Sequence, residues 1–278
     1  VAHGAFLAQT GVRPQSRNLL MADSELRFTR IRLFVEDDLA VGGAIVLGRD
    51  QSHYLQNVMR RGVGDRVALF NGRDGEYWAE LIEMRRAAAR VSVSGQLRTQ
   101  VSEPDVWLTF APIKRAAVDF MTTKATELGV ARLLPVLTAR TNSERVNTRR
   151  LRANATEAAE QSERLSVPVV DEPVRLPALL AAWPAERCLL VGDETGAGRP
   201  IAQVAAELLS DARVVPPLAV MTGPEGGFVP EELDQLRDLP FVIPVGLGPR
   251  VLRADTAALA ALAVVQAVAG DWRSGRMG

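Results

Sequence analysis

The stretch Leu218-Ala-Val-Met-Thr-Gly-Pro-Glu-Gly-Gly-Phe228 is an apolar run that ends in a glycine-rich loop. Its first four residues, Leu218–Met221, predict a buried β-strand. Three glycines within Gly223–Gly227 let the backbone approach a ligand closely and adopt positive φ angles. The segment therefore predicts a strand followed by a ligand-binding loop.

A second loop of this kind follows the next predicted strand, Phe241–Val245, and reads Gly246-Leu-Gly-Pro-Arg-Val-Leu-Arg-Ala-Asp-Thr-Ala257. In an open parallel sheet, ligands bind outside the carboxyl ends of the strands. Because the two loops follow consecutive strands, we expect them to hold one ligand from two sides. Taken singly, each loop is equally compatible with a tight turn between strand and helix. Neither contains the dinucleotide pattern G-x-G-x-x-G or the phosphate-binding pattern G-x-x-x-x-G-K-[ST].

From Pro104 onward, predicted strands alternate with predicted helices. Further strands are expected at Val106–Phe110, Leu133–Leu137 and Leu189–Val191. Helices are expected at Ala116–Leu128, with Gly129 as its stop, and at Arg149–Leu165, Pro230–Leu239 and Ala254–Ala269. This alternation predicts an α/β fold, a parallel sheet with helices on both faces.

The region from Ile31 to Val93 has a different pattern. Short β-type runs lie at Ala44–Leu47, Arg66–Phe70, Tyr77–Ile82 and Arg90–Val93, and His53–Arg60 is expected to form a short helix. Short strands with few helices predict a small β-barrel. The polar residues 96–104 are an expected linker. We therefore expect an extension over residues 1–20, a barrel over 21–100 and an α/β domain over 104–278.

Composition limits the classes of function. The 33 Lys and Arg balance 33 Asp and Glu, but the basic residues concentrate in the middle: residues 110–165 hold ten against six, and residues 166–278 hold nine against fourteen. The single cysteine, Cys188, predicts a buried strand residue and a protein of the reducing cytoplasm. With two histidines we expect no metal site, and without an apolar run of roughly 20 residues we expect no membrane span.

In combination, several motifs resemble those of one enzyme family. Gly223-Pro-Glu-Gly-Gly227 and Leu247-Gly-Pro-Arg-Val-Leu-Arg-Ala-Asp-Thr-Ala257 resemble the cofactor loops of SPOUT-class methyltransferases, and are closest to the RsmE family, which methylates N3 of a uridine in 16S ribosomal RNA. Lys124–Val130, Glu157–Ser162 with Arg164, and His53–Arg60 with Gly64-Asp65 resemble further motifs of this family. The resemblance covers about Arg30 to Trp272.

The resemblance implies properties that composition does not show. It implies a SPOUT-like domain with a deep trefoil knot, a PUA-like RNA-binding barrel before it, a homodimer, and S-adenosyl-L-methionine as cofactor. The acceptor would be 16S rRNA or the small ribosomal subunit, so the chain would act in rRNA processing and ribosome biogenesis. The implied cofactor-binding residues are Thr222, Gly223, Gly226, Gly227, Leu247, Gly248, Val251, Leu252, Thr256 and Ala257.

Three positions depart from the family pattern. Thr138-Ala-Arg-Thr141 lacks a glutamate that often precedes the arginine, and Glu163 stands where glycine is common. Asp255 replaces a common glutamate. None of the three departures removes a glycine from the two loops. The first two departures bear on contacts with RNA.

Methylation of uridine N3 needs an in-line approach, loss of the N3 proton, and stabilisation of charge on O2 and O4. The catalytic candidates are Arg253, Glu225 and Thr256. Arg253 suits the stabilisation of the base, or forms a salt bridge with Asp255 or Glu225. Thr256 either caps the following helix or binds cofactor or base. Glu225 either holds a cofactor group, acts as base, or is a first-turn acid of the next helix.

Basic and polar residues in two regions are candidates for contact with RNA phosphates. Those of the basic middle also fit an ordinary solvated helix face. The RNA-binding candidates are His53, Arg60, Arg61, Lys114, Arg115, Lys124, Arg140, Gln161 and Arg164.

Two other functions compete with this interpretation. One is a related SPOUT enzyme that acts on another RNA or another atom, such as a ribose 2′-OH. The other is a ribosome-assembly factor that binds RNA and cofactor without turnover. A fold alone does not separate these functions. The intact glycines favour an enzyme over the binding protein.

Overall fold

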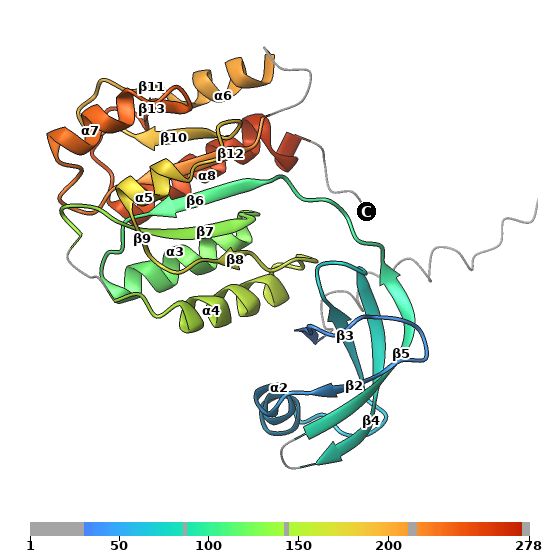
Figure 1. The fold of residues 1–278 in the computed structure, drawn as a ribbon. Helices are drawn as coiled ribbons and strands as arrows, with labels where there is room; N and C mark the ends of the chain where they lie inside the picture. Colours follow the sequence, from blue (N-terminus) through green and yellow to red (C-terminus); the bar gives the residue numbers. More distant parts are fainter. Residues whose placement is uncertain (1–30, 86–87, 142–144, 211–215, 274–278) are drawn as a thin grey trace, which may run out of the picture. The chain divides into compact units, whose positions relative to one another are not determined.

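The computed structural model describes residues 31–85, 88–141, 145–210 and 216–273 (Figure 1). The chain divides into two compact units, which are described separately. The first comprises residues up to Val35, Leu39–Leu69 and Tyr77–Gln96, and the second comprises Glu36–Asp38, Phe70–Glu76 and Leu97–Gly278. The expected extension over residues 1–20 lies outside the described residues.

The first unit is built on a five-stranded sheet with the order β1-β3-β4-β5-β2. Its strands are β1 (Arg32–Phe34), β2 (Ala44–Leu47), β3 (Arg66–Phe70), β4 (Glu76–Arg85) and β5 (Ala88–Arg98). Side chains alternate across the sheet: Ala89 and Val91 are buried, whereas Arg90 between them is exposed. Strands of this kind confirm the β-rich pattern. The expected linker begins too early, because β5 continues to Arg98.

One helical segment accompanies this sheet. It begins as α2 (Arg49–His53) and continues as a π-helical turn, η1 (Tyr54–Val58). The expected helix over His53–Arg60 was therefore misplaced at both ends. Its continuation stops because Arg60 has a φ of 53°, in the left-handed region. The Ser52 hydroxyl donates to the Gly48 carbonyl (2.8 Å) and accepts from the Ala89 N–H (2.8 Å), which ties the helix to β5.

The second unit contains an eight-stranded sheet with the order β11-β13-β10-β12-β6-β7-β8, and β9 also pairs with β7. Its strands are β6 (Val106–Phe110), β7 (Arg132–Leu137), β8 (Val169–Val170), β9 (Val174–Arg175), β10 (Cys188–Gly192), β11 (Arg199–Pro200), β12 (Leu218–Thr222) and β13 (Val242–Gly246). The described strand pairs of this sheet are parallel. The parallel sheet expected from the alternation of strands and helices is confirmed.

Helices cover both faces of this sheet (Figure 1). They are α3 (Arg115–Glu127), α4 (Thr148–Gln161), α5 (Leu176–Ala181), α6 (Ile201–Ser210), α7 (Pro230–Arg237) and α8 (Ala254–Ala269), followed by the 3₁₀ turn η2 (Asp271–Arg273). Successive strand residues point to opposite faces. Leu190 joins the core beneath α3, α4, α6 and α8, whereas Leu189 joins the core beneath α5 and α7. Continuous apolar strands therefore form two cores.

Two helix ends test the expected boundaries. As predicted, α3 stops just before Gly129, which has a φ of 83°. The helix expected over Arg149–Leu165 ends earlier, at Gln161, because Glu163 has a φ of 62°. The sequence pattern placed Glu160 and Arg164 in one helix. In the structure Arg164 lies beyond the end of α4.

Two further expectations concern single features. Cys188 lies in a strand as predicted, but it is half-buried at the start of β10. Within the described part of the chain, no helix has the length and apolar character needed to cross a membrane.

Candidate active site

The carboxyl ends of β6, β12, β10 and β13 in the second unit lie at the same edge of the sheet, here called the carboxyl edge. Phe110 at the end of β6 pairs with Thr222 at the end of β12, and Val191 of β10 pairs with Met221. Gly192 at the end of β10 pairs with Val245 of β13. Because the strands are parallel, the loops that follow them gather at this edge, where α/β sheets bind ligands.

The two sequence-predicted loops are not immediate neighbours at this edge. Strand β10 lies between β12 and β13. A third loop, Asp193–Gly198 (the β10 loop), therefore lies between the glycine loop, Gly223–Phe228, and the second loop, Leu247–Arg253. The β10 loop packs closely against the end of β13, since a Cβ on Gly198 would lie 2.7 Å from the Gly246 nitrogen.

The glycine loop begins with a buried hydroxyl group. Thr222 is 4% exposed, and its Oγ1 has no hydrogen-bond partner among the described residues. A buried, unpaired polar group costs about 1–3 kcal/mol. A ligand with a hydrogen-bonding group at the end of β12 would satisfy it. Next to it, the Phe228 ring closes against Gly223, where a Cβ would lie 3.0 Å from the ring.

An arginine from the neighbouring strand connection holds the glycine loop. Arg140, which follows β7, donates from Nη1 to the Gly226 carbonyl (2.6 Å) and, at 3.4 Å, to the Phe228 carbonyl. The two partners are more than 80 residues away in sequence. The structure places the guanidinium group of Arg140 on the backbone of the predicted cofactor loop. The side chain is also exposed, and its expected contact with RNA stays a prediction.

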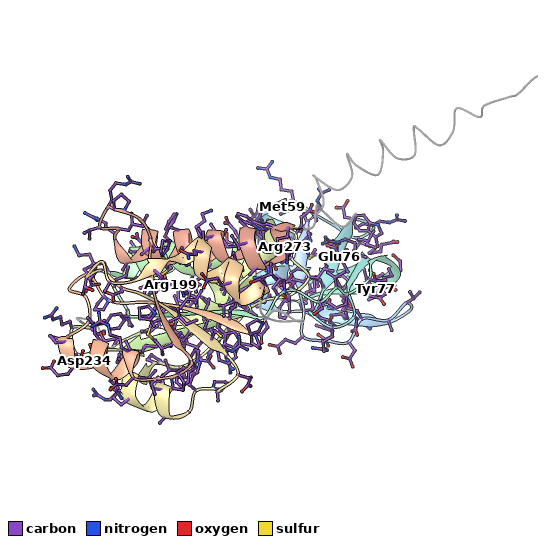
Figure 2. The ribbon with its side chains drawn as sticks, turned by 90° about the horizontal axis from the view of Figure 1, so that it is seen from above. Met59, Glu76, Tyr77, Arg199, Asp234 and Arg273 are labelled. Atoms are coloured by element: carbon purple, nitrogen blue, oxygen red, sulfur yellow. The ribbon has the colours of Figure 1, made fainter. Side chains whose placement is uncertain are left out.

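Sequence reasoning missed two carboxylates of the β10 loop. Asp193 is buried and forms an ion pair with Arg237 of α7 (2.9 Å). Desolvation raises its pKa, but the Thr195 hydroxyl and Arg237 more than offset this, so the pKa is lowered. Arg237 also lies 3.9 Å from Asp234, which is labelled in Figure 2. The ion pair between Asp193 and Arg237 fixes the β10 loop to α7.

Glu194 lies directly against the glycine loop, where a Cβ on Gly227 would come 2.6 Å from its Cδ. Partial burial of the carboxyl and the nearby Asp193 charge raise the pKa of Glu194, while the Phe228 N–H and Arg140 oppose this shift. A carboxyl group with a raised pKa is better suited to accept a proton. The only signal for Glu194 in the sequence was its position shortly after the predicted strand Leu189–Val191.

We predict that Glu194→Gln stabilises the protein at neutral pH. A raised folded-state pKa means that ionisation is less favourable in the folded than in the unfolded chain, so wild-type stability falls as pH rises through this pKa. Thermal unfolding should show a higher midpoint for Glu194→Gln at pH 7, and the difference should vanish below the ordinary glutamate range. The control is Glu186→Gln, at an exposed position. An equal midpoint difference at both pH values would contradict the prediction.

The second loop leads into α8. Leu247 packs on the core, Gly248 has a φ of 97°, and Val251 is 91% exposed. Arg253 is the N-cap residue of α8; its side chain is exposed and forms no ion pair with any described residue. The alternative salt bridge to Asp255 or Glu225 is therefore absent from the described structure.

Two alternatives for the other catalytic candidates are wrong. Thr256 does not cap α8, because the helix begins at Ala254; its own N–H instead donates to Asp255 Oδ1 (2.8 Å). Glu225 is not a first-turn acid of α7. It lies in the exposed turn closed by Gly227 N–H and the Pro224 carbonyl, whereas Glu232 caps that helix.

The structure divides the predicted RNA-contact residues into two groups. Lys114 and Arg115 lie at the start of α3, at the carboxyl edge, and both are exposed. Lys124 and Gln161 lie at the far ends of α3 and α4, which run back from this edge. A helix of α3's length extends about 20 Å. The carboxyl edge therefore does not include Lys124, which pairs with Glu127 (2.7 Å), or Gln161.

Arg164 serves the interior of the second unit. It is 7% exposed, pairs with Glu103, and donates from Nη1 to the carbonyls of Thr126 (2.7 Å) and Val130 (3.0 Å). Its guanidinium group is thus committed to internal contacts. This assigns Arg164 a structural role in place of the expected RNA contact.

We predict that Arg164→Met destabilises the protein by about 3–5 kcal/mol, because it leaves Glu103 and two carbonyls without their buried partner. Urea unfolding would measure the change. Lys124→Ala, which removes a more exposed ion pair, should cost less than about 1 kcal/mol. Unchanged stability of Arg164→Met together with weaker RNA binding would restore the RNA role.

In the first unit, His53 is exposed in the middle of the helical segment, where α2 meets η1, and Arg60 is exposed just beyond its end. Arg61 is partly buried and lies 3.8 Å from Asp65. In the described part of both units, no group of three or more His, Cys, Asp or Glu side chains is placed to bind a metal.

The fold and site together define a class of protein. Residues 101–266 match the family model described as RNA methyltransferase domain, and residues 47–93 match the RNA methyltransferase PUA domain. Together, a small N-terminal β-unit and a parallel sheet with glycine-rich loops at its carboxyl edge define a two-domain RNA methyltransferase.

Relatives that match more than four fifths of the chain narrow this class. Ribosomal RNA small subunit methyltransferase E of Rickettsia conorii is 30% identical over 236 residues, which cover 84% of this chain and 94% of the relative. The enzyme of the same name from Synechocystis is 30% identical over 239 residues, covering 85% and 77%. The chain belongs to the ribosomal RNA small subunit methyltransferase E family, as the resemblance of its motifs indicated.

Solved structures agree with this assignment. The structure of the Neisseria gonorrhoeae enzyme of this family, bound to S-adenosyl methionine, has a TM-score of 0.77 and 27% identity, and the match covers 87% of this chain and 99% of that chain. A putative methyltransferase from Legionella pneumophila in complex with the same cofactor has a TM-score of 0.76 and 27% identity, with the same coverage.

Proposed function

We propose that this chain methylates N3 of a specific uridine in 16S rRNA of the small ribosomal subunit, with S-adenosyl-L-methionine as methyl donor. The names of its relatives support the ribosomal substrate, and the Neisseria and Legionella structures support the cofactor. The single observation that carries the proposal is the buried hydroxyl of Thr222 at the start of the glycine loop, which has no hydrogen-bond partner among the described residues.

The residues present fit this cofactor. Thr222 offers a buried hydroxyl, and a Cβ on Gly248 would meet no atom within 4 Å. Gly223, Gly226 and Gly227 belong to the proposed cofactor set as residues of the glycine loop, whose backbone packs against Phe228, Arg140 and Glu194. Leu247, Val251, Leu252, Thr256 and Ala257 complete the proposed cofactor set from the second loop and α8. When bound, the cofactor supplies an electrophilic methyl group. Arg140 would keep the glycine loop in shape, since it already bonds two of its carbonyls.

Arg253 is the side chain that we assign to the target base. It projects from the end of the second loop without an internal ion pair, so its charge is available to O2 and O4 as N3 loses its proton. Glu225 and Thr256, both exposed at the same edge, complete the proposed catalytic set. Base exposure or flipping must present the uridine to these groups.

The remaining properties also follow from family membership. We propose a PUA-like RNA-binding domain within residues 21–100 and a SPOUT-like methyltransferase domain within residues 104–278. The trefoil knot, the homodimer and a cytoplasmic location belong to the same proposal. The path of the chain supports the knot, because β13 lies outside β10 and α8 then returns to pack against β12 and β6.

The test uses purified protein, labelled S-adenosyl-L-methionine, and two acceptors from cells that lack the gene: small ribosomal subunits and free 16S RNA. A single N3-methyluridine, mapped by mass spectrometry, is the expected product. Tight cofactor binding without transfer to any RNA would overturn the enzyme assignment and favour an assembly factor. A methyl group on a ribose would favour a related SPOUT activity.

A further inference from the structure

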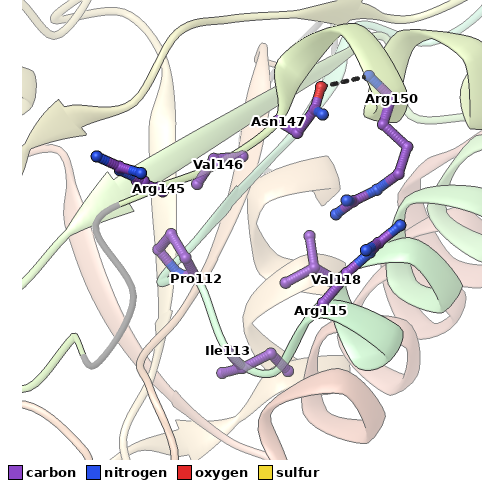
Figure 3. Close-up of a pocket in the computed structure, with 8 residues that line it drawn as sticks. All are labelled: Pro112, Ile113, Arg115, Val118, Arg145, Val146, Asn147 and Arg150. Atoms are coloured by element: carbon purple, nitrogen blue, oxygen red, sulfur yellow. Dashed lines mark hydrogen bonds between the residues drawn. The ribbon is translucent and has the colours of Figure 1, made fainter.

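A small pocket at the carboxyl edge is walled by three arginines. It has a volume of about 110 Å³ and is lined by Arg115, Arg145, Arg150 and by Pro112, Ile113, Val118, Val146 and Asn147. Figure 3 shows Arg145 on the opposite side of the pocket from Arg115 and Arg150. This arginine pocket is far smaller than the roughly 300–1,000 Å³ of small-molecule sites. Its size suits one compact ionic group.

Within the described part of the chain, the positive charges of the arginine pocket exceed the negative charges paired with them. Among the described residues, Asp119 is its one carboxylate partner, at 2.8 Å from Arg150 and 3.8 Å from Arg115. Arg145 is exposed and has no ion pair among the described residues. Among the described residues, three guanidinium groups face one carboxylate, which leaves an excess of positive charge. Figure 3 shows the guanidinium groups of Arg115 and Arg150 close together.

The secondary structure adds to this excess. Arg115 is the first residue of α3, and Asn147 caps α4, where it accepts from the Arg150 N–H (3.0 Å). Helix N-termini carry partial positive charge and favour acidic residues, yet the first turns of both helices contain none. Arginine at these positions is therefore unfavourable for the free protein. A bound anion, in contrast, would interact favourably with both the arginines and the partial positive charge of the two helix N-termini.

We propose that the arginine pocket binds one phosphodiester group of the RNA backbone. This rests on the proposed function, which makes RNA the substrate, and it names a contact on that substrate. Guanidinium groups bind phosphate oxygens in a forked, charge-assisted geometry. The pocket lies at the same edge as the glycine loop and the second loop, so a phosphate held there would set the position of the strand relative to Arg253. Phosphate contacts of this kind position the RNA but do not read its sequence.

The test compares two arginines near the start of α4. Arg145 lines the pocket, whereas Arg149 is an exposed residue of the first helical turn that does not line it. Arg145→Ala should raise both the Kd for unmodified 16S RNA and its KM by about tenfold or more. It should also lower the slope of log K against log salt by about 0.7. Arg149→Ala should change these quantities less than about twofold. Equal effects of the two variants would overturn the proposal.

A second arm identifies the phosphate. In the shortest 16S fragment that the wild type methylates, single neutral methylphosphonate linkages are introduced one at a time. One position should weaken wild-type binding but not further weaken Arg145→Ala binding; absence of any such position would overturn the proposal. Stabilisation of the wild type but not of Arg145→Ala by inorganic phosphate, with equal RNA affinities, would mean a free-anion site instead.

The two arms also separate this inference from the function on which it rests. If the wild type transfers no methyl group but Arg145→Ala binds RNA more weakly than Arg149→Ala, the pocket stands and the enzyme assignment fails. If the wild type methylates 16S RNA and the two variants behave alike, only the pocket assignment fails.

Discussion

Gly227→Ala should weaken S-adenosyl-L-methionine binding by at least about thirtyfold, measured by isothermal titration calorimetry. Gly227 has a φ of 68°, a region that costs an L-residue roughly 1–2 kcal/mol. Its added methyl group would also displace the Glu194 carboxyl, which accepts from the Phe228 N–H. Loss of that bond adds about 1 kcal/mol or more. The loop would relax in the free protein and would have to be restored for binding.

The neighbouring glycine is the matched control. A Cβ on Gly226 would lie 3.4 Å from Arg140 Cδ, an ordinary contact, and Gly226 does not have a positive φ. Gly226→Ala should therefore change cofactor affinity less than about threefold. Adding Glu194→Ala to Gly227→Ala should recover the part due to overlap and leave the part due to backbone strain. Equal losses in Gly226→Ala and Gly227→Ala would contradict this account of the loop.

Arg253→Ala should lower the rate of methyl transfer by about 10²–10³, the effect of removing one group that stabilises developing charge. Cofactor affinity should stay within a few-fold. The structure makes this separation possible, because Arg253 caps α8 through its backbone while its side chain makes no cap hydrogen bond. Single-turnover transfer to 16S RNA and calorimetric binding of the cofactor would measure the two effects.

Arg250→Ala is the control for charge, since Arg250 is an exposed arginine of the same loop. It should leave the transfer rate within about threefold of wild type. Arg253→Lys should recover only part of the rate, because an ammonium group cannot make the forked contact of a guanidinium group. If Arg253→Ala weakened cofactor binding as much as transfer, Arg253 would be a cofactor or structural residue.

Local patterns were sufficient for most of the elements. Leu218–Met221 and Ala254–Ala269 form a strand and a helix close to where the sequence places them, because a continuous apolar run and a helical period are local signals. The glycine loops were likewise visible as loops. Two helices end earlier than expected, at Val58 and at Gln161. Each is followed by a residue that has a positive φ and is not glycine, Arg60 and Glu163 respectively. Such conformations are imposed by surrounding structure and have no local signal.

The candidate site was predicted only in part. Thr222, the glycines and Arg253 were found because they lie within two motifs. Glu194 was missed because its role depends on β10 being placed between β12 and β13, which strand order in the sheet decides. The contact of Arg140 with the glycine loop was missed for a similar reason, since its partners on that loop are more than 80 residues away.

By itself, the sequence determined that the chain holds a parallel α/β unit with two glycine-rich loops, and its motifs indicated the family. Those features rest on periodicity and on backbone freedom at glycine, which are properties of neighbouring residues. Only the tertiary structure decided which charges meet. In the folded chain, buried Arg164 pairs with Glu103, and Arg140 donates to the Gly226 carbonyl. Arg115, Arg145 and Arg150 line one pocket. The physical reason is that electrostatic interactions depend on distances in space, which the packing of distant segments sets.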